Sequence, residues 1–267
     1  MKKVVKFGGS SLANAEQFQK VGDIIRSDES RRYVVPSAPG KRFDEDIKVT
    51  DMLYGCYDAA SKGEDFSDKL KAIKERYYEI IKGLGLTLSL EDEFKKIEED
   101  FRAQAGIQYA ASRGEFLNGK IMAAYLGYDF VDAASVIRFD KNGNLEAEET
   151  NKLLSKKLSK CQSAVIPGFY GACADGTVKT FSRGGSDVTG SLVAKAIHAD
   201  IYENWTDVSG FLVTDPRIVH NPEPIEAITY RELRELSYMG ATVLHEDAIF
   251  PVRKEGIPIN IKNTNRP

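Results

Sequence analysis

The chain has 267 residues, of which 42% are hydrophobic and 29% are charged, the balance of a folded domain rather than a disordered chain. This length fits one large α/β domain or two closely packed lobes. The net charge of -3 argues against bulk binding to nucleic acid or to anionic membranes, because both need an excess of Lys and Arg. No window reaches the run of about 18 apolar residues that a membrane helix requires. Glycines interrupt the N-terminal segment too early for a signal peptide.

The three cysteines, Cys56, Cys161 and Cys173, are odd in number and lack the spacing of metal ligands. They therefore predict idle thiols in a reducing, cytoplasmic environment. The three histidines are scattered and form no metal-binding pair, so we expect no protein metal site. The expected partners are small molecules rather than nucleic acid or membrane, and a homo-oligomer is compatible with the sequence.

The chain opens with alternating extended and helical patterns. Residues 3–7 are rich in β-formers and end at two glycines. Residues 15–26 carry apolar side chains at helical spacing, and we expect a serine to cap this helix. Residues 33–36 have the pattern of a strand. The start of the chain therefore predicts the β-α-β unit of a parallel sheet.

The middle of the chain, from about residue 49 to 126, has an almost entirely helical pattern, clearest at 68–81 and 90–101. A strand is expected at 128–132, and a hairpin is expected over 136–149. Further strands are predicted at 163–169, 178–181, 201–204 and 257–261, and further helices at 186–199, 229–238 and 243–254. This order predicts the class α/β: a three-layer α/β/α sandwich with a mainly parallel central sheet. Ligands of such folds bind at the carboxyl ends of the strands.

The first candidate site is Lys6-Phe7-Gly8-Gly9-Ser10-Ser11, where a strand meets a glycine turn. Two glycines let the backbone approach a ligand closely, and successive N–H groups ahead of a helix can hold an anion. A lysine at the strand end can place its ammonium group against phosphate oxygens. Taken alone, a tight turn with a surface lysine explains the segment equally well.

Two further candidate sites follow later strands. In the segment 182–187, SRGGSD, an arginine suited to a carboxylate precedes two glycines and a helix start. Ser186 or Asp187 could simply cap that helix. The segments TDVSG and TDPR, within 206–217, follow the strand at 201–204 and so fall at the carboxyl edge of the sheet. As isolated turns they are common and indicate little.

Together these segments resemble the signature set of the aspartokinases, within the amino-acid kinase superfamily. The matching segments are KFGGSS at 6–11, SAPG at 37–40, RGE at 113–115, FSRGGSD at 181–187, TDVSG with TDPR at 206–217, and MGA with VLH at 239–245. They run in the same order along the whole chain. The resemblance implies the amino-acid kinase α/β/α fold and the transfer of phosphate from ATP to the side-chain carboxylate of L-aspartate. That reaction is the first step toward lysine, threonine and methionine.

The resemblance also implies roles for individual residues. Lys6 would bridge phosphate groups, and Asp187 would orient the charges of the active site. Glu115 would meet the α-amino group of aspartate, and Arg183 its α-carboxylate. Other residues implied at the aspartate site are Ser37, Ala38, Thr50, Phe169, Gly184 and Ser186. Those implied at the nucleotide site, besides Lys6, are Gly8, Gly9, Ser10, Thr206, Asp207, Leu212, Asp215 and Arg217.

The implied cofactors are ATP and Mg²⁺, with the ion held mainly through the nucleotide. One catalytic domain would span residues 1–267, with a substrate lobe over about 1–180 and a nucleotide lobe over about 181–267. Aspartokinases usually continue into paired ACT domains, and this chain stops at Pro267, so feedback inhibition of this chain alone is not expected.

The sequence departs from the family pattern at two places. Leu212 stands where many relatives have an aromatic residue that contacts adenine. The segment 263–266 lacks a lysine that many relatives carry, and the nearest basic residues are Lys262 and Arg266. Two alternatives stay open: a sister kinase with another acceptor, such as acetylglutamate, glutamate, carbamate or a nucleoside monophosphate, or a non-catalytic module that binds a nucleotide or an amino acid.

Overall fold

A six-stranded parallel sheet forms the centre of the protein, with strand order β3-β4-β2-β1-β7-β8. The computed structural model describes residues 1–182, 184–208, 210, 219–220, 222–223, 225–238, 244 and 246–267, with the backbone alone for 234, 236–238 and 246–248. The strands of the sheet are β1 (Lys3–Phe7), β2 (Arg31–Pro36), β3 (Asp129–Phe130), β4 (Ala164–Val165), β7 (Ile201–Thr206) and β8 (Ile259–Asn263). A separate antiparallel pair consists of β5 (Tyr170–Ala172) and β6 (Val178–Thr180). The expected mainly parallel sheet is confirmed.

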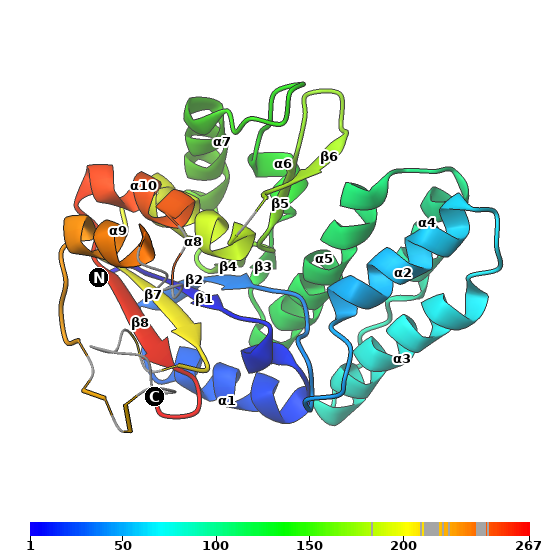
Figure 1. The fold of residues 1–267 in the computed structure, drawn as a ribbon, viewed down its shortest axis with the longest axis horizontal. Coiled ribbons are helices and arrows are strands. Elements are labelled where there is room, and N and C mark those ends of the chain that lie inside the picture. Colours follow the sequence, from blue (N-terminus) through cyan, green and yellow to red (C-terminus); the bar gives the residue numbers. More distant parts are fainter. Residues whose placement is uncertain are drawn as a thin grey trace.

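Helices cover both faces of the sheet, and one group extends to the side as a helical block (Figure 1). Strand β1 shows why, because its side chains alternate between two cores. Val4 belongs to the core under α8, whereas Val5 and Phe7 belong to the core that includes α1. The helices are α1 (Ala15–Arg26), α2 (Val49–Ser61), α3 (Ser67–Gly83), α4 (Glu91–Arg102), α5 (Ile107–Leu126), α6 (Ala133–Val136), α7 (Ala147–Leu158), α8 (Gly185–Ala196), α9 (Tyr230–Tyr238) and α10 (Glu246–Glu255), with a short 3-10 turn η1 (Ser10–Leu12). The predicted three-layer α/β/α sandwich is confirmed.

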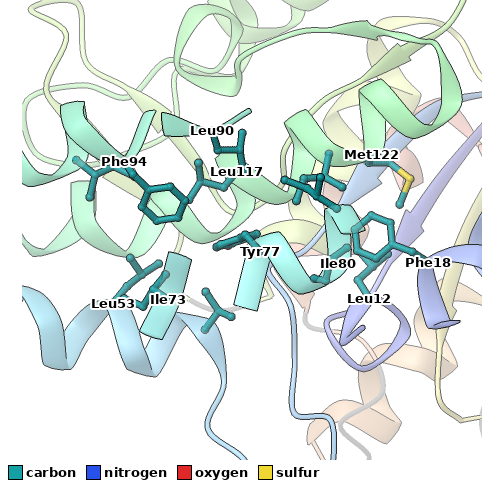
Figure 2. Packing of buried hydrophobic residues seen from close by; sticks show 14 of the residues in the cluster. Leu12, Phe18, Leu53, Ile73, Tyr77, Ile80, Leu90, Phe94, Leu117 and Met122 are labelled. Atoms are coloured by element: carbon teal, nitrogen blue, oxygen red, sulfur yellow. The ribbon is translucent and has the colours of Figure 1, made fainter. Parts of the chain in front are cut away.

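The helical block α2–α5 is held by a core of large side chains, several of which Figure 2 shows gathered around Tyr77. Tyr77 is fully buried, and its hydroxyl donates a hydrogen bond of 2.7 Å to the carbonyl oxygen of Gly114 on α5. The neighbouring ring of Phe94 lies 6.2 Å from that of Tyr77. The core therefore fixes helix α5 at the residue that precedes Glu115.

A buried group of charges ties the beginning of β2 to β7. Arg31 and Glu203 are 7% and 2% exposed, and the Arg31 Nε lies 2.8 Å from the Glu203 carboxylate. Glu203 also accepts a hydrogen bond of 2.9 Å from the indole of Trp205, and Lys3 lies 3.2 Å away. Burial alone would raise the pKa of Glu203, but the hydrogen bond and charge of Arg31, together with the hydrogen bonds from Trp205 and Lys3, outweigh it and hold that pKa below its usual range. The carboxylate is therefore charged and fully partnered.

Replacing Glu203 with alanine is expected to lower the free energy of unfolding by about 3–5 kcal/mol, because the variant leaves the Arg31 guanidinium buried without its counter-charge. Urea denaturation followed by circular dichroism measures this loss. Glu16→Ala is the matched control: it removes an exposed carboxylate from the surface pair with Lys20 and should cost no more than about 0.5 kcal/mol. Equal stabilities for the two variants would contradict the assigned role of Glu203.

The hairpin predicted over 136–149 forms only around its turn, and its second arm is much shorter than predicted. Only one antiparallel bridge forms, between Phe139 and Leu145, and helix α7 begins at Ala147. Backbone hydrogen bonds join the two arms, from the Asp140 N–H to the Asn144 carbonyl at 2.8 Å and from the Glu146 N–H to the Arg138 carbonyl at 2.9 Å. Within the turn, the Asp140 carboxylate also accepts hydrogen bonds from the N–H groups of Asn142 and Asn144. Thr150, Leu154 and Leu158 are the buried residues of α7 at helical spacing, a pattern that the prediction passed over.

The expected serine cap of the first helix is also wrong. Asn14 is the N-cap of α1, and its side chain accepts a hydrogen bond of 3.0 Å from the N–H of Gln17. Ser10 and Ser11 lie in the preceding 3-10 turn η1. The strands expected at 128–132 and 163–169 are confirmed in place but reduced to two residues each, β3 and β4. The helix predicted at 243–254 is described from Glu246 onward.

Candidate active site

Lys6 lies near the carboxyl end of β1, in the middle of the sheet. Its ammonium Nζ is 2.6 Å from the Asp187 Oδ1, which belongs to the first turn of α8. The Asn204 amide on the adjacent strand β7 donates a hydrogen bond of 2.8 Å to the same oxygen. Only 10% of the Lys6 side chain and 16% of the Asp187 side chain are exposed. We call these three residues the Lys6 cluster, a fixed cation at the edge where parallel sheets bind ligands.

Asn204 is a member of this cluster that sequence reasoning missed. It stands opposite Lys6 in the register of β1 and β7, and its Oδ1 lies 3.5 Å from the Lys6 ammonium. It is 4% exposed, so its amide needs partners inside the protein. The signal that could have found it is a polar amide inside an otherwise buried strand, one residue before Trp205.

The glycine turn after β1 is locked against the turn after β2. The Gly8 N–H donates to the Trp205 carbonyl at 3.0 Å, and the Gly40 N–H donates to the Gly9 carbonyl at 2.8 Å. A Cβ on Gly40 would lie 2.6 Å from the Gly9 carbonyl carbon, closer than real Cβ atoms come to any backbone. The two turns can touch only because both residues lack side chains.

Gly40→Ala is therefore expected to push the two turns apart and to lower the catalytic efficiency at least about 10-fold, since misplacement by about 1 Å is costly in a positioned site. Steady-state kinetics and the melting temperature of the variant check this. Gly55→Ala on α2 is the control, because a Cβ there meets nothing within 4 Å. Normal kinetics for Gly40→Ala would show that the contact between the turns is dispensable.

A cleft of about 620 Å³ opens beside these turns. Thr206 and Asp207 approach it from β7, and Thr50 approaches it from the start of α2. The structure brings together nine residues that the sequence predicted for the site: Gly8, Gly9, Ser10, Ser37, Ala38, Thr50, Glu115, Thr206 and Asp207. The same cleft is lined by residues that sequence reasoning did not assign, namely Pro39, Gly40, Lys41, Arg42, Phe43, Asp44 and Lys48.

Glu115 is the most unusual residue of this cleft. It is 6% exposed, and its Oε2 atom is buried without a hydrogen-bond partner among the residues that the structure describes. Burial raises the pKa of Glu115 to about 8, although the N–H of Ala38 and the charge of Arg113 act in the opposite direction. An unpartnered buried carboxyl oxygen is costly to keep. In a cleft wall it is a ready acceptor for a cationic or hydrogen-bond-donating ligand.

Three other predicted residues meet at the start of α8. Phe169 has a backbone φ of +80°, a conformation that bulky residues rarely adopt. Its ring packs on Gly185, where a Cβ would lie 2.7 Å from the Phe169 Cδ2, and its N–H donates to the Thr189 hydroxyl at 3.2 Å. Gly184 is the N-cap residue with φ +56°, and Ser186 packs against Gly168. This strained contact places Phe169 at the positive end of α8, next to Asp187.

Four predicted site residues, Arg183, Leu212, Asp215 and Arg217, lie outside the described residues, as does most of the segment 239–245. Of the two basic residues near Pro267, Lys262 places its ammonium 4.6 Å from the centre of the Trp205 ring.

Within the described part of the chain, no three His, Cys, Asp or Glu side chains come together as a metal site. Over the same residues, no helix is both long enough and apolar enough to cross a membrane.

The sequence and the fold match those of known proteins. The model of the amino acid kinase family matches residues 1–263, so the chain belongs to the amino acid kinase family. Aspartokinase 3 of Bacillus subtilis is 41% identical over 279 residues, which cover 99% of this chain and 62% of that protein. The motif resemblance to aspartokinases is thereby confirmed.

Solved structures agree with this placement. The crystal structure of aspartate kinase from Clostridium acetobutylicum superposes with a TM-score of 0.95 at 55% identity, over 99% of this chain and 61% of that one. Escherichia coli aspartokinase III in complex with aspartate and ADP superposes with a TM-score of 0.86 at 28% identity, over 99% of this chain and 62% of that one. The chain thus spans about three-fifths of the length of these relatives.

Proposed function

We propose that this chain transfers the terminal phosphoryl group of ATP to the side-chain carboxylate of L-aspartate, giving ADP and 4-phospho-L-aspartate. This is the first step of lysine, threonine and methionine biosynthesis. The observation that carries the proposal is the unpartnered, buried Glu115 carboxyl in the wall of the cleft that the Gly8-Gly9 turn also lines. One cleft thus offers an acceptor for an ammonium group and backbone donors for phosphate.

The chemistry explains why no histidine base is needed. The side-chain carboxyl of aspartate has an intrinsic pKa of about 3.9, so at neutral pH it is already a nucleophile. The obstacle is repulsion between this anion and the anionic triphosphate. Fixed positive charge and N–H groups that are in place before the reaction relieve it. The Lys6 cluster supplies such a charge, because Asp187 and Asn204 hold the ammonium at the sheet edge.

The aspartate substrate needs one binding group for its α-ammonium and another for its α-carboxylate. Glu115 is assigned to its ammonium group, with Ser37, Ala38 and Thr50 lining the same wall. Arg183 is assigned to its α-carboxylate on the strength of the family motif. Phe169, Gly184 and Ser186, which meet at the start of α8, would border the amino acid. Thr206 and Asp207 would contact the nucleotide, with Leu212, Asp215 and Arg217.

Magnesium fits this site as an ion that arrives with the nucleotide. Mg²⁺ usually keeps several waters and takes one or two carboxylates together with substrate phosphates. Asp207 is an exposed carboxylate in the lining of the cleft and is the side chain we assign to it. When bound, the ion neutralises charge on the phosphate groups. The rest of the nucleotide lobe, which we assign to about residues 181–267, would hold the base and ribose.

The test is ADP release coupled to a spectroscopic readout, with MgATP and L-aspartate as substrates. Release that depends on aspartate supports the proposal. Release that depends on glutamate, acetylglutamate, carbamate or a nucleoside monophosphate, with none from aspartate, would select a sister kinase. Binding of ADP and aspartate in calorimetry without turnover would select a non-catalytic module.

A further inference from the structure

The loop of residues 41–48 borders the cleft and takes no part in the roles assigned above. Five of its residues, Lys41, Arg42, Phe43, Asp44 and Lys48, line the cleft. The loop begins directly after Gly40, the residue that contacts Gly9 of the glycine turn, and ends at the start of α2. We call it the 41–48 loop.

A carboxylate with two arginine partners anchors this loop. Asp46 accepts hydrogen bonds of 2.9 Å from both the backbone N–H and the Nε of Arg42, and its Oδ2 lies 2.5 Å from the NH1 of Arg76. Arg76 is 4% exposed and also donates to the carbonyl of Gly40 at 3.0 Å. These arginines hold the pKa of Asp46 well below its usual range, with the Arg42 hydrogen bond as the main cause. The loop is therefore fixed to helix α3 by charge-assisted bonds.

The two lysines of the loop contribute nothing to this anchor. The Lys41 ammonium donates to the Asp44 carbonyl at 2.8 Å, and neither Lys41 nor Lys48 forms an ion pair with any described residue. Both are exposed, and both line the cleft. Lys6, in contrast, already shares its charge with Asp187 at 2.6 Å. Among the described residues that line the cleft, Lys41 and Lys48 are thus the ammonium groups without a carboxylate partner.

We propose that Lys41 and Lys48 bind the phosphate groups of the nucleotide. The inference rests on the proposed use of ATP. Lys41 follows Gly40, which contacts Gly9 of the Gly8-Gly9 turn that we assign to the phosphates, and its side chain lines the same cleft as that turn. A lysine on a flexible stem suits a phosphate as a point charge, whereas Arg42, the guanidinium of the loop, is engaged by Asp46 and Glu79. The anchor at Asp46 holds the loop so that both lysines stay at the cleft.

The experiment titrates ADP, inorganic tripolyphosphate, adenosine and L-aspartate into the full chain by isothermal calorimetry. Lys41→Ala and Lys48→Ala are each expected to weaken ADP binding by about 3- to 10-fold. This is the loss expected when one charge-assisted contact is removed from a site that solvent partly screens. Tripolyphosphate should lose affinity in parallel, and adenosine and aspartate should not change. The loss should shrink as salt is raised from 0.05 to about 0.5 M, because salt screens exposed charges.

Lys62→Ala is the matched control, since Lys62 lies at the other end of α2 and pairs with exposed Asp58. Lys48→Arg should keep most of the affinity. ADP affinity within about two-fold of the parent in both alanine variants would overturn the proposal, as would a parent chain that binds neither ADP nor tripolyphosphate. Weaker aspartate binding with unchanged ADP binding would overturn it too. Lysine-dependent ADP binding without aspartate turnover would support the inference while refuting the proposed substrate.

Discussion

Lys6→Ala is expected to lower kcat for aspartate phosphorylation by about 10²–10³-fold, the loss typical of removing one preorganised group that stabilises transition-state charge. Lys6 is the buried cation at the carboxyl edge of the sheet, and Asp187 and Asn204 hold it in one position. Its loss removes positive charge where two anions must approach. The KM values should change less than kcat, because the other contacts assigned to both substrates remain.

Two controls separate this effect from misfolding. Lys20→Ala removes an exposed lysine on α1 that pairs with Glu16 on the surface, and it should leave kcat unchanged. Circular dichroism and the melting temperature of Lys6→Ala show whether the variant remains folded when Asp187 has lost its partner. A folded Lys6→Ala variant with kcat within about three-fold of the parent would exclude Lys6 as the catalytic cation.

The second large effect concerns Glu115 and pH. Because burial raises the pKa of Glu115 to about 8 in the free protein, most of it is protonated at pH 6.5. An ammonium ligand prefers the carboxylate, so aspartate binding should release a proton. The KM for aspartate is therefore expected to fall as the pH rises from 6.5 toward 8, by no more than about ten-fold per pH unit. Kinetics across this range at constant MgATP measure it.

Glu115→Gln should remove this pH dependence and raise the KM for aspartate, because an amide offers no charge to the ammonium. Glu93→Gln on α4 is the control, since that carboxylate pairs with Lys120 away from the cleft lining. A pH profile of Glu115→Gln that matches the parent profile would show that another group titrates.

The same residue links function to stability. The folded-state pKa of Glu115, about 8, lies above the ordinary value of 4.5. Between these values the unfolded chain has lost the proton that the folded chain keeps, so the free energy of unfolding falls as pH rises through this window. Glu115→Gln removes the penalty and should be more stable than the parent at pH 8 by a few kcal/mol, with little difference below pH 4.5. Residues that bind a substrate commonly make the folded protein less stable than it could be.

Much of the fold could be predicted from local patterns. The opening β-α-β unit was predicted because β1 and β2 are short, almost continuously buried runs rich in β-formers, whereas α1 buries apolar residues at helical spacing. The hairpin predicted over 136–149 was too long, because its second arm ends where helix α7 begins at Ala147. The Asp140 side chain supports the turn by hydrogen bonds from Asn142 and Asn144, and the buried residues that follow have a helical period. Short side-chain bonds of this kind have no signal in periodicity.

The candidate site, like the fold, was predicted only in part. Glycine turns and motif residues are contiguous in sequence, so they could be predicted, and nine of them line one cleft. Asn204 could not, because its role depends on the register that sets β7 beside β1. The 41–48 loop was seen only as a charged stretch. Asp46 anchors this loop through Arg76, which lies thirty residues further along the chain, so the sequence alone did not show which cations of the loop are free.

The most direct test of the account follows oxygen from substrate to product. The chain is incubated with MgATP and L-aspartate that carries ¹⁸O in its side-chain carboxylate, and the product is cleaved with hydroxylamine at its carbonyl carbon. Attack by the carboxylate on the terminal phosphorus predicts inorganic phosphate that contains one ¹⁸O atom, detected by mass spectrometry. ATP consumption that yields only unlabelled phosphate, or no consumption at all, would contradict phosphoryl transfer to aspartate.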